Sequence, residues 1–352
     1  LERLSKRWQQ VHEADTDSKP RLRLIENRFE ELVRKAEFTF TPDEEGQERR
    51  LSELSDGQRS LFHIALTAAT LETEREAFSL PADDKLRRIH LTILAIEEPE
   101  NSLSPFFLSR IIKQAREIGA LPSAQVLLSS HSPSILSRIE PEEVRYFRMD
   151  RSARCSSIRE LTLPEDDVEA SVYVRLAVKA YPELYFARFV ILGEGDSERV
   201  VIPKIAEEMG VSLDPSFVPV VPLGGRFVAH FWRLLNDLEI PHATLLDLDL
   251  GRRHGGANAM RSCLQNLAAI GSNFGSTNGA NAAQLTDQQL YNEGLQGQWL
   301  QAFRREGVFF SYPIDLDFAM LLAFPTAYQV ANPGGNGPQS SAAAIQAKKV
   351  ST

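Results

Sequence analysis

The sequence has few cysteines and no long apolar run. Its two cysteines, Cys155 and Cys263, are too few for a disulfide framework or a four-thiolate zinc site. No apolar run approaches the roughly 20 residues that span a bilayer, and we expect no signal peptide at the start of the chain. These absences predict a protein of the reducing cytoplasm with no membrane partner.

The sequence also lacks an excess of positive charge. It has 39 Lys and Arg against 48 Asp and Glu, which gives a net charge of −9. Composition therefore gives no sign of a strongly basic surface for nucleic acid. It does not exclude nucleic acid as a partner, because a site that holds divalent metal ions must itself be acidic.

Length and composition predict an ordinary globular protein with room for about two domains. The chain has 352 residues, of which 43% are hydrophobic and 25% charged. It starts with Leu1 rather than Met, so we expect a fragment from which part of the function is absent.

Apolar periodicity predicts an α/β fold. An amphipathic helix is expected over 1–39, and a parallel strand–helix–strand unit over 89–96, 105–118 and 125–129. A peripheral hairpin is expected over 143–162. A helix is expected over 166–180. From residue 184 a second α/β unit is expected, with strands over 188–192, 217–221, 243–248 and 308–311 and helices over 197–209 and 226–238 and from residue 317. We predict two domains, 1–183 and 184–352, the second with a flexible insertion over about 251–297 and a poorly ordered tail.

Acidic residues end the first of these buried strands. Glu97 and Glu98 follow the apolar run over 89–96, where a nucleotide hydrolase places the acid that holds Mg²⁺ through water and the acid that polarises the attacking water. Upstream, Ser55-Asp56-Gly57-Gln58 opens a helix whose N–H groups are able to hold a phosphate. His131 follows the next strand, within reach of a γ-phosphate. Taken singly, each feature is also explained as a strand end, a helix cap or a structural histidine.

In this order the features resemble the C-terminal half of an ABC-type ATPase head, of the branch that includes the SMC and recombination-repair ATPases. The resemblance implies that Ser55, Gly57 and Gln58 form the signature that reaches the ATP of a second copy in a head-to-head homodimer. It implies that Glu97 is the Walker B acid, where the family usually has Asp. It also implies that Glu98 is the catalytic base and His131 the switch histidine.

One element of such a site is lacking. No Gly-x-x-x-x-Gly-Lys-Ser/Thr phosphate loop occurs in the sequence. Without it the β- and γ-phosphates lose their main cradle. We expect this chain alone to hydrolyse ATP poorly.

Four further acids follow two strands of the second unit. Glu194 follows the strand over 188–192, and Glu198 lies one helical turn later, where it folds back toward the same point. Asp247 and Asp249 end the strand over 243–248, and a spacing of two puts both on one face of an extended chain. Neighbouring parallel strands bring these ends to one rim, where four carboxylates repel unless divalent cations are bound. The alternative is a set of acidic loop residues that face solvent.

Glu-Gly-x-x-Glu followed by Asp-x-Asp resembles a Toprim domain, the module of topoisomerases, DnaG-type primases and some nucleases. An ABC-type head followed by Toprim resembles the OLD (overcoming lysogenisation defect) family of ATP-powered nucleases. The resemblance implies two Mg²⁺ or Mn²⁺ ions at Glu194, Glu198, Asp247 and Asp249, with ATP as a second cofactor. Relatives also use a late acid and a lysine, for which the candidates here are Asp315, Asp317, Lys348 and Lys349.

Basic residues near the predicted rim are candidates for contacts with the DNA backbone. Arg226 follows the glycine pair after the strand over 217–221, and Arg252 and Arg253 follow the Asp pair. A glycine turn and a solvated basic loop are the alternative explanations.

The sequence thus predicts a metal-dependent DNA endonuclease coupled to an ABC-type ATPase, in phage defence or DNA processing. One alternative is an ATP-switched DNA-binding clamp whose Toprim site is inactive. Another is a topoisomerase or primase. The sequence contains no recognisable strand-passage domain around any of its seven tyrosines, and two cysteines do not make a primase zinc module.

Overall fold

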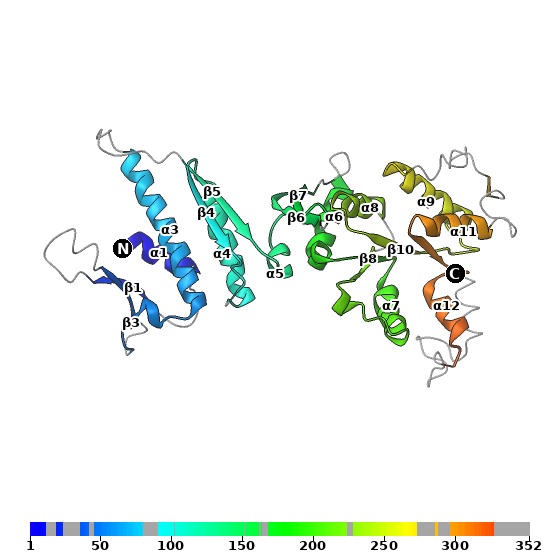
Figure 1. Cartoon of the computed structure of the whole chain (residues 1–352), viewed down its shortest axis with the longest axis horizontal. Coiled ribbons are helices and arrows are strands. Elements are labelled where there is room, and N and C mark those ends of the chain that lie inside the picture. The colour runs from blue at the N-terminus through cyan, green and yellow to red at the C-terminus, as the bar shows by residue number, and fades with distance from the viewer. Residues whose placement is uncertain are drawn as a thin grey trace. The chain divides into compact units, whose positions relative to one another are not determined.

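The computed structural model of the 352-residue chain describes residues 1–11, 19–23, 36–41, 46–79, 91–101, 103–150, 152–161, 163, 168–223, 228–272, 286–287 and 296–326. The chain divides into two compact units, Leu1–Ile139 and Glu140–Thr352 (Figure 1). Across the described ranges, every helix is too short or too polar to span a bilayer.

The N-terminal unit opens with a short helix and an antiparallel sheet rather than one long helix. Helix α1 covers Glu2–Val11, and strands β1 (Lys19–Arg23), β2 (Glu37–Thr41) and β3 (Arg49–Arg50) pair in that order. The prediction of one helix over 1–39 is therefore confirmed over Glu2–Val11 and wrong at β1 and β2. Pro20 disfavours a helix interior, and the alternating Glu-Phe-Thr-Phe-Thr of β2 suits a strand.

The rest of this unit is the predicted parallel α/β core. After the 3₁₀ turn η1 (Leu51–Glu53) come helix α3 (Asp56–Ser79), strand β4 (Thr92–Glu97), helix α4 (Pro105–Gly119), strand β5 (Ala124–Ser129) and the short helix α5 (Pro133–Leu136). β4 and β5 pair in parallel over their whole length, with Glu97 opposite Ser129. The strand–helix–strand prediction is confirmed, and both strands end at the same edge.

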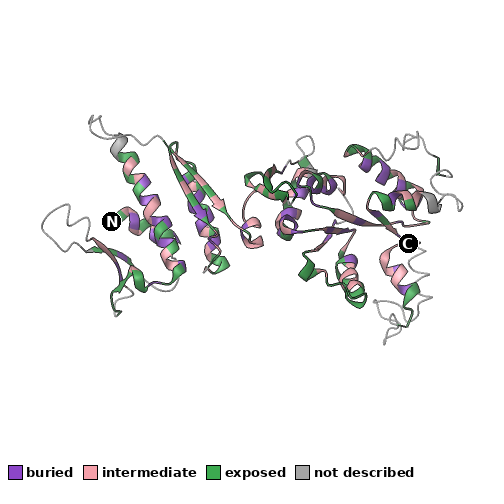
Figure 2. Cartoon of the chain, in the orientation of Figure 1, coloured by how far each residue is buried: buried purple, intermediate pink, exposed green. Residues whose placement is uncertain are grey.

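Aromatic and aliphatic side chains form the core of this unit. Trp8 of α1, Phe40 of β2 and Phe62 of α3 are almost fully buried, and their rings contact one another at tilted or edge-on angles. Helix α4 adds a buried face to the same core (Figure 2). Ile111 belongs to that face. The core thus joins the N-terminal helix to the α/β layer.

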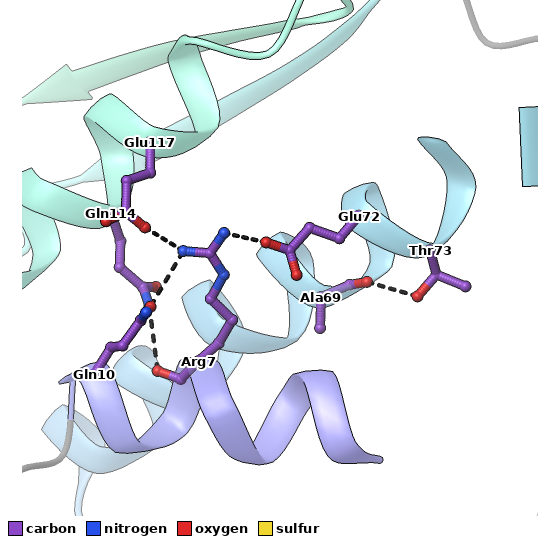
Figure 3. Close-up of polar contacts among 7 residues, drawn as sticks. All are labelled: Arg7, Gln10, Ala69, Glu72, Thr73, Gln114 and Glu117. Atoms are coloured by element: carbon purple, nitrogen blue, oxygen red, sulfur yellow. Dashed lines mark hydrogen bonds and ion pairs between the residues drawn. The ribbon is translucent and has the colours of Figure 1, made fainter. Parts of the chain in front are cut away.

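A charged network joins three helices of the same unit (Figure 3). The guanidinium of Arg7 in α1 pairs with Glu72 of α3 and Glu117 of α4. Gln114 Nε2 donates to the Arg7 carbonyl over 3.2 Å. Burial lowers the pKa of Arg7, but its hydrogen bonds with the two glutamates outweigh burial and raise it overall. The side chain of Arg7 is only 15% exposed, so the network fixes these helices relative to one another.

The second unit begins with a hairpin that lies N-terminal to the predicted boundary at 183–184. After the 3₁₀ turn η2 (Pro141–Glu143), strands β6 (Arg145–Asp150) and β7 (Cys155–Glu160) form this hairpin. Helix α6 (Val168–Ala180) and the 3₁₀ turn η3 (Pro182–Phe186) follow it. Arg159 of β7 pairs with Glu239, and Tyr173 of α6 donates to the Leu223 carbonyl. The division between compact units therefore falls after Ile139.

A parallel four-stranded sheet forms the centre of the second unit, in the order β11-β10-β8-β9. Its strands are β8 (Val190–Gly193), β9 (Val220–Pro222), β10 (His242–Asp247) and β11 (Val308–Ser311). The helical elements are α7 (Asp196–Glu208), η4 (Asp214–Ser216), α8 (Val228–Asp237), α9 (Ala257–Ala269), α11 (Gln296–Arg305) and α12 (Leu316–Ala323). β8 and β10 are neighbours, and β11 lies beside β10, so their carboxyl ends share one rim.

Helix α9 lies inside the segment that was predicted as a flexible insertion over 251–297. Its buried side chains are Met260, Cys263, Leu264 and Leu267, a spacing that matches one face of a helix. The prediction of a loop is therefore wrong for Ala257–Ala269, because the Gly- and Asn-rich composition of the whole segment hid a local helical period. Residues 273–285, 288–295 and the predicted tail after 326 lie outside the described part of the chain.

Candidate functional site

Two acids meet where the central strands of the second sheet end. Glu194 directly follows β8, and Asp247 is the last residue of β10. The strands are in parallel register, with Gly193 opposite Leu245. Glu194 Oε2 accepts a hydrogen bond of 2.7 Å from the Asp247 backbone N–H. The rim predicted from the two strand ends is therefore formed.

Glu198 folds back toward this rim from the first turn of α7. Its Oε2 accepts a hydrogen bond of 2.7 Å from the Gly195 N–H, and the residue is 3% exposed. Gly193 makes room for it, since a Cβ at Gly193 would lie 2.4 Å from the Glu198 Cβ. The glycine at the end of β8 is required by this close approach.

Asp247 has the most strongly perturbed carboxyl of the rim. Burial raises its pKa to about 7, and the charges of Glu194, Glu198 and Asp315 add to that rise. Ser311, the last residue of β11, donates a 2.7 Å hydrogen bond to Asp247 Oδ1 and partly offsets it. Burial and the neighbouring acids also raise the pKa of Glu194, against the hydrogen bond from Asp247 N–H. The rim thus concentrates negative charge in a partly desolvated place.

Asp249 and the late acids lie on the β11 side of the rim. Asp249 has a left-handed backbone, with φ 49°. Arg252 donates to Asp249 Oδ1 and lies 3.6 Å from Asp315 Oδ2. Asp315 caps α12 by accepting a 2.7 Å hydrogen bond from the Phe318 N–H, and Asp317 lies in the first turn of that helix.

The donor set suits a hard divalent cation, but the side chains are not gathered around one point. In the ranges that the structure describes, no three Asp, Glu, His or Cys side chains are close enough to hold one metal ion. Each carboxylate is instead bonded to a protein donor, such as the Asp247 N–H for Glu194 and the Gly195 N–H for Glu198. Carboxylate oxygens at one strand-end rim are nevertheless the ligands that Mg²⁺ and Mn²⁺ prefer, so the chemistry of the donors fits these ions.

The basic residues predicted to contact DNA have different surroundings. Arg253 is exposed in the loop after β10, whereas Arg252 is partly buried and paired with the acids of the rim. Arg226, Lys348 and Lys349 lie outside the described residues.

In the N-terminal unit, the acid pair and the histidine also meet. Glu97 is exposed at the end of β4, and Glu98 follows with a left-handed backbone, φ 42°. Glu98 Oε1 lies 3.0 Å from His131 Nδ1, and its Oε2 accepts from the Asn101 side chain over 2.6 Å. The structure therefore brings Glu98 and His131 together at the ends of β4 and β5.

Glu100 anchors the loop that carries His131. Its Oε1 accepts a hydrogen bond of 2.7 Å from Ser130 Oγ and one of 3.2 Å from the His131 N–H. Its side chain is only 11% exposed. This role of Glu100 was not predicted from the sequence.

The predicted signature segment opens α3. Ser55 Oγ accepts from the Gln58 N–H over 3.3 Å, and Gln58 Oε1 accepts from the Ser55 N–H over 3.2 Å. These reciprocal bonds have the geometry of a capping box. Ser55 is exposed and Gly57 is buried.

Three contributors to the acidic rim were also missed from the sequence. Ser311 orients Asp247, Arg252 pairs with two acids, and Gly255 contacts the Asp249 backbone so closely that a Cβ would lie 1.7 Å from Asp249 O. Only Gly255 left a signal, in the Gly255-Gly256 pair. The bond from Ser311 to Asp247 joins segments about 60 residues apart in the sequence. The pairs of Arg252 depend on the fold of the turn after β10 and on the position of Asp315.

Comparison with known families matches both units. Residues 185–249 match the model described as "Overcoming lysogenization defect protein-like, TOPRIM domain". Residues 1–137 match "AAA domain, putative AbiEii toxin, Type IV TA system". The chain is therefore similar to the OLD family over its Toprim part and to an ATPase domain over its first unit. The family match to an ATPase domain followed by Toprim confirms the resemblance inferred from the sequence.

Two curated relatives of this chain carry nuclease names. Endonuclease GajA of Bacillus cereus (strain VD045) is 30% identical over 167 residues, which is 47% of this chain and 28% of that protein. OLD nuclease of Thermus scotoductus (strain ATCC 700910 / SA-01) is 28% identical over 165 residues, 44% of this chain and 30% of that protein. The chain thus spans less than a third of each relative's length in these matches.

Solved structures also match parts of the chain. The C-terminal region of the Xanthomonas campestris pv. campestris OLD protein is 24% identical, with a TM-score of 0.30, over 40% of this chain and 58% of that one. The SmcHead bound to the C-winged helix domain of ScpA is 14% identical, with a TM-score of 0.34, over 47% and 42%.

Proposed function

We propose that the second unit of this chain is a DNA endonuclease that hydrolyses phosphodiesters with two divalent metal ions. The observation that carries the proposal is the bond between Glu194 and the Asp247 N–H at one strand-end rim, toward which Glu198 folds back, within the residues that match the OLD-like Toprim model. The nuclease names of the two curated relatives support the same activity.

The acids of the rim would hold the ions, which are Mg²⁺ or Mn²⁺. Glu194, Glu198, Asp247 and Asp249 are the proposed ligands, with Asp315 or Asp317 as the late acid. When bound, two such ions supply activation of the attacking water and stabilisation of the leaving oxygen. The other groups of the chain orient these ligands: Ser311 Oγ holds Asp247 Oδ1 at 2.7 Å.

Glu194 is the proposed general base wherever it is not a ligand. Its raised pKa makes it a better proton acceptor than an ordinary glutamate. The Asp247 N–H that it accepts from fixes one carboxylate oxygen, so the other is the oxygen available to take a proton from water.

The N-terminal unit is proposed to link this chemistry to ATP. Glu98 and His131 already contact each other where a γ-phosphate is expected, and Glu97 would hold the metal of the nucleotide. Ser55, Gly57 and Gln58 would face the ATP of a second copy, in a homodimer through the heads. The biological setting is proposed to be phage defence or DNA processing.

The test is nicking of supercoiled plasmid by the full chain, with divalent metal omitted or added as Mn²⁺. We expect nicking only with metal. Glu198→Gln should abolish it, while Glu208→Gln, at the exposed far end of the same helix, should leave it unchanged. Metal-independent nicking, or a Glu198→Gln variant with wild-type activity, would contradict the proposal.

The alternatives give different results in the same assay. A clamp with an inactive Toprim site would bind DNA without nicking it at any metal concentration. A topoisomerase would relax the plasmid and leave the strands sealed.

A further inference from the structure

The loop after β10 brings an arginine into the acidic rim. Arg252 Nη1 donates to Asp249 Oδ1, and Arg252 Nη2 lies 3.6 Å from Asp315 Oδ2. Asp249 follows β10 and Asp315 follows β11, which are neighbouring strands. One guanidinium therefore connects the acids of two strands.

The place of Arg252 is fixed by a tight turn. The Arg252 N–H donates to the Asp249 carbonyl over 3.0 Å, and the Gly255 N–H donates to the Arg252 carbonyl over 3.1 Å. Gly256 N–H closes the turn on the Leu248 carbonyl over 2.6 Å. Because a Cβ at Gly255 would overlap Asp249 O, the turn packs directly against the second acid. The turn therefore holds the backbone of Arg252 beside Asp249.

The side chains of Arg252, Asp249 and Asp315 are all partly buried. The side chains of Arg252 and Asp249 are 32% and 30% exposed, and that of Asp315 is 14% exposed. Partly buried pairs are screened less than pairs on an open surface. The charge of Arg252 therefore acts on Asp249 and Asp315 with less screening than it would have on an open surface.

We propose that Arg252 is a built-in counter-cation of the rim, which competes with a divalent metal ion for Asp249 and Asp315. This inference rests on the proposed metal-dependent function. The guanidinium occupies carboxylate oxygens that a metal would take, and its positive charge opposes the arrival of a second cation. Arg252 is a positioning residue: it holds the two acids together and sets how much metal the rim needs.

Two effects follow when the charge is removed. Metal should bind more tightly, since a competitor and a repelling charge are both gone. The fold without metal should become less stable, since the crowded carboxylates lose their counter-charge. A residue whose role is only to contact DNA would produce neither effect.

The experiment is calorimetric titration of Mn²⁺ into the full chain without DNA, together with thermal unfolding in the presence of a chelator. For Arg252→Gln we expect Mn²⁺ to bind about three- to tenfold more tightly, the range for removal of one charge from a partly screened site. In chelator its melting temperature should fall by about 2–4 °C, the shift that a modest loss of stability produces in a domain of this size.

Two matched variants complete the design. Arg253→Gln, in the adjacent exposed position, should match the wild type in both measurements. Arg252→Lys keeps the charge and should keep Mn²⁺ affinity within about twofold of wild type, although its bonds to the two acids differ.

The outcomes separate this inference from the proposed function. Unchanged or weaker Mn²⁺ binding by Arg252→Gln, in a chain whose wild type binds Mn²⁺, overturns the competition but leaves the nuclease site intact. A wild-type chain that binds no Mn²⁺ overturns both. An unchanged melting temperature in chelator rejects the counter-charge role of Arg252 by itself.

Discussion

Gly193→Ala tests the packing of the acidic rim with one methyl group. The new Cβ would lie 2.4 Å from Glu198 Cβ and 2.8 Å from Glu198 Cγ. The Cβ of Glu198 is fixed by helix α7, so relief requires a shift of the whole first turn of the helix. That shift would break the hydrogen bond from the Gly195 N–H to Glu198 Oε2.

The magnitude follows from known costs of overpacking. An extra methyl group in a packed core costs about 1–3 kcal/mol. In a domain of this size each kcal/mol lowers the melting temperature by about 2–4 °C. We therefore expect a loss of about 2–12 °C and loss of metal-dependent nicking, because Glu198 is displaced from the rim.

Gly195→Ala is the matched control, two residues away. Its Cβ would meet Glu198 Oε2 at 3.8 Å, an ordinary contact, and its φ of −147° is extended backbone that alanine adopts freely. It also keeps the N–H that donates to Glu198. Thermal unfolding and plasmid nicking of both variants decide the matter. If Gly193→Ala melts and nicks like the wild type, the proposed position of Glu198 against β8 is wrong.

Three further predictions concern the charged network of the N-terminal unit, the effect of pH and the turnover of ATP. Arg7→Met should reduce the free energy of unfolding by about 1–3 kcal/mol in denaturant titration, because Glu72 and Glu117 lose their shared partner; a loss below about 0.5 kcal/mol would contradict the role of the network. Burial lowers the pKa of His242, against a hydrogen bond to the Ile240 carbonyl, so the fold favours neutral His242. Its contribution is present above the unfolded pKa of about 6.5 and decreases as pH falls below it, so the wild type should lose more thermal stability than His242→Gln between pH 7.5 and 5.5. Equal losses would count against this. Finally, phosphate-release assays should detect little ATP turnover by this chain even where it nicks DNA, since the phosphate loop is absent, and robust turnover would mean that the nucleotide site is misplaced.

The sequence predicted the parts of the fold that have a strong local period. Strands β8 and β10 and the acids that follow them were recognised from apolar runs that stop at Glu194 and Asp247. The parallel sheet then placed those ends together, as the topology confirms. The hairpin β6–β7 and helix α12 were likewise expected close to where they lie.

What the sequence could not supply depends on contacts between distant segments or on weak local signals. The Gly- and Asn-rich composition around helix α9 masked its local period, and strands β1 and β2 were predicted as helix although Pro20 disfavours a helix interior. The bond from Ser311 to Asp247 requires knowledge that β11 lies beside β10. The pairing of Arg252 with Asp249 and Asp315 could not be predicted, and the prediction that Arg252 contacts DNA stays a prediction beside it.

The dependence of nicking on metal concentration tests the central claim most directly. The rate of plasmid nicking is measured against Mn²⁺ concentration for wild type, Asp247→Asn and Asp214→Asn. Asp247 ends β10 at the rim, whereas Asp214 is exposed in η4, before β9 begins. Loss of one carboxylate ligand should raise the Mn²⁺ requirement about tenfold or more for Asp247→Asn, while Asp214→Asn follows the wild-type curve. If Asp247→Asn also follows the wild-type curve, the rim of the second unit does not hold the metal that cuts DNA.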